Sequence, residues 1–211
     1  MQFIFGDNRT SYSLIYTDDD KNNANRVREL LKFPISPNEK FNTIGFLPYG
    51  TNSNNAFFFC IKKDRELSRS VYYMNGFYKE MTPEYLCGKG LIDDICMKYI
   101  NQEEYNRLRD GGAVEEYLSL NYELSVTDAA DIHINREILL EIIANIYQKN
   151  KVLIAIDDEK YSDEYVALLL KKIFVYLTPS LKKSCSYISA VVKTGNMEFV
   201  LNFVPKSMLE D

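Results

Sequence analysis

Two adjacent carboxylates, Asp157 and Asp158, directly follow the apolar run 152–156. Carboxylate oxygens are the ligands that Mg²⁺ prefers, and sites in α/β sheets commonly lie just past the carboxyl end of a strand. The pair is therefore a candidate metal site of an enzyme. Acidic residues also favour the start of a helix without any metal, so the structural explanation stays open beside the metal site.

Other candidates for chemistry are sparse in this chain. Carboxylates cluster at Asp18–Asp20, Asp93-Asp94, Glu103-Glu104 and Glu115-Glu116. A Ser-His-Asp or Cys-His site would have to use His133, the only histidine. The four cysteines have no CxxC spacing, which predicts free thiols and no zinc site. Phosphate-loop, nucleophile-elbow, zincin and kinase signatures do not occur, so we predict no catalytic residue and no cofactor.

The cluster Gly6-Asp7-Asn8-Arg9 lies between two apolar runs, 2–5 and 11–16. A phosphate-binding loop would need more glycines and a helix after it. A strand-like run follows instead, so we predict a hairpin turn. In that hairpin Phe5 would pair with Thr10, and Phe3 with Tyr12.

The composition of the chain limits the classes of partner that the protein can bind. The 211 residues carry a formal net charge of −5, which disfavours nonspecific nucleic-acid binding. No run of 18 apolar residues and no signal-peptide pattern occurs, so we expect a cytoplasmic protein without a membrane span. The chain has 16 tyrosines, 12 phenylalanines and no tryptophan, a composition typical of half-buried strand faces or contact surfaces.

The first 80 residues are typical of a β meander with one inserted helix. Alternating and apolar runs predict strands at 2–5, 11–16, 42–49, 56–63 and 68–80, and a helix at 24–33. Pro48 favours an edge position for the third of these strands. Cys60 lies within an apolar strand, which predicts a buried and inert thiol.

The rest of the chain is richer in helices. Thr82 and Pro83 begin a helix that breaks near Gly88, and further helices are predicted at 91–100, 101–112 and 134–150, the last capped by Asn135. An apolar, buried strand at 151–156 precedes a helix at about 161–177. A one-turn helix or bend follows it. Strands at 185–192 and 197–204 would form a hairpin through 193–196.

These elements predict an α+β fold. A β-rich N-terminal meander is followed by helices and a C-terminal α-β-α-β-β unit, which form a mixed sheet with helices packed on it. We expect one domain over 1–211, with a subdivision into 1–80 and 81–211.

Three stretches together resemble a known family, the N-terminal domain of bacterial GTPase-associated adaptor proteins. They are FIFGDNRTSYSLIY (3–16), GFLPYGTNSNNAFFFCI (45–61) with SRSVYYMNGFY (68–78), and the strand, helix and Leu177-Thr178-Pro179 turn within 151–189. The resemblance implies a noncatalytic module of a GTPase-linked bacterial conflict system, encoded as the N-terminal piece of a longer protein.

The predicted function is therefore a noncatalytic adaptor or protein-interaction module whose partner is a protein. A GTPase or further domains of a longer chain would be such a partner. Two alternatives remain open at this point. One is a metal-dependent enzyme centred on Asp157 and Asp158, and the other is a phage or mobile-element protein that binds a host factor.

Overall fold

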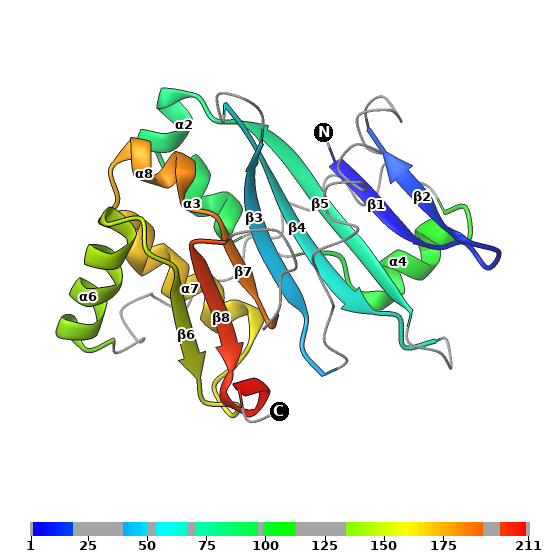
Figure 1. Cartoon of the computed structure of the whole chain (residues 1–211). Helices are drawn as coiled ribbons and strands as arrows, with labels where there is room; N and C mark the ends of the chain where they lie inside the picture. The colour runs from blue at the N-terminus through cyan, green and yellow to red at the C-terminus, as the bar shows by residue number, and fades with distance from the viewer. Residues whose placement is uncertain are drawn as a thin grey trace.

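The computed structural model describes residues 2–18, 40–49, 54–66, 71–96, 99–112, 134–191 and 199–209. Within these ranges one eight-stranded sheet carries six α-helices (Figure 1). The strands are β1 (Gln2–Asp7), β2 (Tyr12–Thr17), β3 (Thr43–Tyr49), β4 (Asn55–Lys63), β5 (Tyr72–Glu80), β6 (Val152–Ile156), β7 (Tyr187–Ser189) and β8 (Leu201–Pro205). The helices are α2 (Pro83–Cys87), α3 (Gly90–Ile95), α4 (Gln102–Arg109), α6 (Arg136–Tyr147), α7 (Asp163–Val175) and α8 (Pro179–Ser184), and a 3₁₀ turn, η2 (Lys206–Leu209), follows β8.

The sheet is mixed, in the order β2-β1-β5-β4-β3-β7-β8-β6. The six strands from β2 to β7 pair antiparallel, whereas β7, β8 and β6 run parallel. This confirms the α+β prediction and the β meander followed by helices. The one sheet takes strands from both sides of residue 80.

A row of four aromatic rings crosses the centre of the sheet on its helical face. Register places Phe77, Phe58, Phe46 and Tyr187 side by side on β5, β4, β3 and β7. Adjacent ring centroids are 4.8, 4.8 and 5.6 Å apart, and Phe174 of α7 meets Phe46 edge-on. We call these four residues the aromatic row. Such cross-strand pairs stabilise one register over a slipped one.

Residues of β4 alternate between two apolar clusters because successive side chains of a strand point to opposite faces. Ala56, Phe58 and Cys60 belong to the cluster that includes α2, α3, α6 and α7. Phe57 and Phe59 belong to a second cluster with Phe3 and Phe5 of β1. Cys60 is a buried free thiol, as predicted, and Cys185 is buried as well.

The N-terminal hairpin forms, but its predicted register is wrong. Phe5 pairs with Leu14 and Phe3 with Thr17, since Gly6 and Asp7 continue β1. The turn closes later because the Asn8 side chain accepts hydrogen bonds from the backbone N–H groups of Thr10 and Ser11. A bulge between Ile4 and Phe5 shifts the register further.

Three predictions about strands at the other end of the sheet are wrong. The strand predicted as buried, β6, lies at the edge, and only Ile156 in it is fully buried. The predicted terminal hairpin does not form, since Tyr187 and Leu201 pair in a parallel register. β3 is an interior strand, and it accommodates Pro48 because its pairing with β7 involves only Gly45 and Phe46.

Capping residues start the helices where the sequence indicated. Thr82 caps α2 and Asn135 caps α6, as predicted, and Ser162 caps α7. Helices α3, α6 and α7 are each shorter than predicted. On α6, Ile142 and Ile146 are buried but Ile138 is 53% exposed. No helix within the described ranges is long and apolar enough to cross a membrane.

Several sequence predictions fall outside the described residues. They are the helix at 24–33, the carboxylates Asp19, Asp20, Glu115 and Glu116, the histidine His133 and the turn at 193–196.

We predict that Gly6→Ala destabilises the fold by about 1–3 kcal/mol, the usual cost of overpacking. A Cβ at Gly6 would collide with the ring and hydroxyl of Tyr105, which packs against the β1 backbone. Urea denaturation measures the change. In a Tyr105→Phe background, which removes the colliding hydroxyl, the same substitution should cost less, and an equal cost in both backgrounds would contradict this explanation.

Candidate functional site

Asp157 and Asp158, the predicted metal candidates, lie in the loop between β6 and α7 and are bound to other parts of the chain. The Asp157 carboxylate is 2.6 Å from Nζ of Lys206 and 3.8 Å from Nζ of Lys160. Asp158 accepts a hydrogen bond from the Ser207 N–H and one from Lys40. The hydrogen bond from Lys206 lowers the pKa of Asp157, and the bond from Ser207 lowers that of Asp158.

These contacts connect η2 and the segment before β3 to the β6–α7 loop. In the part of the chain that the structure describes, no group of three or more His, Cys, Asp and Glu side chains converges as metal ligands would. The described geometry therefore gives Asp157 and Asp158 a structural role, and metal binding by this pair remains a prediction.

The other described carboxylate pairs also have structural contacts. Asp94 is buried and accepts a hydrogen bond from the Tyr85 hydroxyl at 2.6 Å. Burial raises the pKa of Asp94, although Tyr85 and Lys79 oppose the shift. Glu104 completes a capping box with Asn101 at the start of α4.

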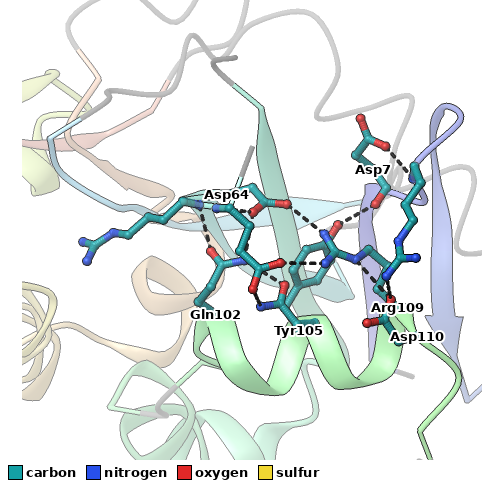
Figure 2. Close-up of polar contacts among 10 residues, drawn as sticks. Asp7, Asp64, Gln102, Tyr105, Arg109 and Asp110 are labelled. Atoms are coloured by element: carbon teal, nitrogen blue, oxygen red, sulfur yellow. Dashed lines mark hydrogen bonds and ion pairs between the residues drawn. The ribbon is translucent and has the colours of Figure 1, made fainter. Parts of the chain in front are cut away.

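A buried charged network lies between α4 and the strands, and sequence reasoning missed it. Figure 2 shows Gln102, Tyr105 and Arg109 projecting from α4 toward Asp64 and Asp7. The Asp64 side chain is fully buried and lies 3.3 Å from Nη1 of Arg109, whose side chain is 6% exposed. No sequence motif predicts the pair of Asp64 and Arg109, because the two residues are 45 positions apart and only the fold brings them together.

The network holds three segments together. Asp64 also accepts hydrogen bonds from Nε2 of Gln102 and from the Glu66 N–H. The Tyr105 hydroxyl donates to the Asp7 carbonyl, and burial raises the pKa of Tyr105 to about 12. Burial alone would lower the pKa of Arg109. The hydrogen bond to Glu66 and the charge of Asp64 raise the pKa by more than burial lowers it, so the guanidinium stays charged.

Close to this network, a cavity of about 320 Å³ opens beside the ends of the central strands. Its cationic side chains are Lys40, Lys62 and Arg65, and its acids are Asp163 and Glu164. Phe41, Tyr99 and Tyr161 supply aromatic walls. The fold assembles this cavity from four separate segments, so no local motif predicts it.

A second hollow, a groove of about 220 Å³, lies at the β6 edge of the sheet between α6, β6 and α7. Ile138, Ile142 and Ile154 line its apolar part, and Asp157 and Lys206 lie at its polar part. We call it the edge groove. The predicted metal candidate Asp157 thus lies beside an apolar groove.

Comparisons of the chain with protein-family models, with curated proteins and with solved structures return no match. The resemblance to bacterial GTPase-associated adaptor proteins therefore stays a prediction.

We predict that Arg109→Met lowers the free energy of unfolding by about 3 kcal/mol or more. The substitution leaves the fully buried Asp64 carboxylate without its cation, and an unpaired buried charge is costly. Arg107→Met, on the half-exposed side of the same helix, should cost less than about 1 kcal/mol. Urea denaturation compares the two, and equal losses would contradict the role assigned to the network.

Proposed function

We propose that this protein is a noncatalytic protein-interaction module that binds an extended segment of a partner as an added strand along β6. The single observation that supports the proposal most is the position of β6, which ends the sheet with no described strand on its outer side. A strand edge presents unpaired N–H and C=O groups, and another strand satisfies them best.

The parallel pairing of β6 with β8 determines which backbone groups remain available. The Val152 N–H donates to the Val200 carbonyl, and Val152 stands opposite Leu201. In a parallel ladder alternate residues bond to the same neighbour. The N–H and C=O groups of Leu153 and Ala155 therefore point away from β8, toward the open side.

Side chains beside this edge suit an apolar strand. Leu153 is 53% exposed, and Ala155 next to it is exposed as well. On the helical side the edge groove offers Ile138 and Ile154. A strand added here would direct alternate side chains into the edge groove and over Leu153, because strand side chains alternate between faces. The partner segment we propose is therefore extended and apolar at every second position.

In this proposal, the outer side of β6 and the edge groove are the surface through which the predicted adaptor binds its partner. A segment of a GTPase, of a further domain or of a host factor would satisfy it equally if that segment is extended and apolar on alternate positions. It needs no catalytic residue, and the contacts of Asp157 and Asp158 with Lys206, Ser207 and Lys40 are compatible with it.

Selection from a random displayed peptide library tests the proposal directly, because the selection needs no identified partner. We expect the protein to select peptides with apolar residues at alternate positions. Binding of the best peptide should slow amide exchange at Leu153 and Ala155. Ala155→Pro removes an outward N–H while leaving the ladder to β8 intact, and should weaken binding at least tenfold.

Val175→Lys is the matched control, because Val175 is a similarly exposed apolar residue (62%) but lies on α7. It should change peptide affinity less than twofold. Circular dichroism and the urea midpoint establish that both variants fold. If no peptide is selected, or if Ala155→Pro and Val175→Lys behave alike, the proposal is wrong.

A further inference from the structure

Arg65 lines the cavity beside the central strands, and its guanidinium has no partner among the described residues. Within the described residues Arg65 makes no side-chain hydrogen bond or ion pair, yet it lines the cavity of about 320 Å³. Lys40, in contrast, pairs with Asp158. Arg65 is therefore the cation most available to a bound molecule.

A second cation in the same cavity is partly available. The ammonium group of Lys62 donates to the carbonyls of Tyr99 and Ile100, at 3.4 and 2.9 Å. An ammonium has three N–H donors, so one remains for a ligand.

The buried network holds the backbone that carries Arg65, and two carbonyls hold the ammonium group of Lys62. The Arg65 N–H donates to Oε1 of Gln102, and Gln102 in turn donates to the buried Asp64. Lys62 is held by the carbonyls just before α4. The Lys62 ammonium is already held in place, so it loses little entropy on binding, and this favours recognition of a small molecule.

The start of α7 supplies acceptors to the cavity. Asp163, at the start of α7, accepts a hydrogen bond from Nδ2 of Asn42 at 2.8 Å, and Glu164 lies next to it. Asp163 and Glu164 balance the charges of Arg65 and Lys62. This balance disfavours a polyanion and favours a molecule with one negative group and a hydrogen-bond donor.

We propose that the cavity binds a small carboxylic acid that carries a hydroxyl or ammonium group next to its carboxylate. Arg65 and Lys62 bind the carboxylate, and Asp163 accepts the hydrogen bond from the neighbouring donor. The body of the ligand packs on Phe41, Tyr99 and Tyr161. This site shares no residue with the edge groove, and the inference does not depend on the proposed strand binding.

Four matched probes test the chemistry by isothermal titration calorimetry. Phenylalanine and 3-phenyllactate carry the donor, 3-phenylpropionate lacks it, and phenyl phosphate replaces the carboxylate by a dianion. We expect at least one of the first two to bind at least fivefold more tightly than 3-phenylpropionate and phenyl phosphate. Arg65→Gln keeps the backbone N–H that binds Gln102 and should weaken that probe at least tenfold.

Arg136→Gln is the control, because Arg136 is an exposed arginine on α6, outside the cavity lining. It should leave the affinity within twofold, and the urea midpoints of both variants should match the wild type. The proposal is overturned if neither donor-bearing probe binds, if phenyl phosphate binds best, or if Arg65→Gln leaves the affinity unchanged.

Discussion

The aromatic row across β5, β4, β3 and β7 sets the register of four strands at once, and helices α2, α3, α6 and α7 pack in the apolar cluster that contains it. Because Phe58 and Phe46 face one side of the sheet, the residues next to them in sequence face the other. A slip by one residue would turn Phe57 and Phe59 toward α7 and move the row to the other face of the sheet. The observed register instead places Phe174 of α7 edge-on against Phe46 and Tyr187, which anchors the longest described helix over the centre of the sheet.

The polar groups at the two ends of the sheet are bound in different ways. At the N-terminal end, α4 packs Tyr105 on Tyr73 and binds Asp64 through Arg109. At the other end β6 has one ladder, to β8, and exposes Leu153. At the first end the charges of Asp64 and Arg109 are paired within the described chain, and β2 is the outermost strand. The open backbone at the second end leads us to place partner binding there.

Local chemistry was predictable from the sequence wherever a few neighbouring residues decide the structure. The apolar run at 56–63 predicted a strand, and Thr82-Pro83 and Asn135 predicted helix starts, because each signal acts over one turn or one strand. The predicted register of the N-terminal hairpin was wrong, by contrast. The turn was expected to begin at Gly6, but β1 continues through Asp7 and the side chain of Asn8 closes the turn.

Global features escaped prediction because they depend on the order of strands. The run 152–156 has the composition of a buried strand but lies at the edge, since β8 inserts between it and β7. Asp157 and Asp158 could be located after a strand, but nothing in the sequence announced Lys206 or Ser207 as their partners. The sequence also did not predict that Arg65 lines a cavity, because that cavity is assembled from segments that are distant in the sequence.

Amide hydrogen exchange of the free protein, resolved by residue along β6, tests the account most directly. If β6 is the open edge of the sheet, the amides of Val152 and Ile154 are protected by β8 while those of Leu153 and Ala155 exchange at least tenfold faster. Equal and strong protection of all four amides would mean that the outer side of β6 is already paired in the free protein. That result would contradict the open edge on which the proposed function depends.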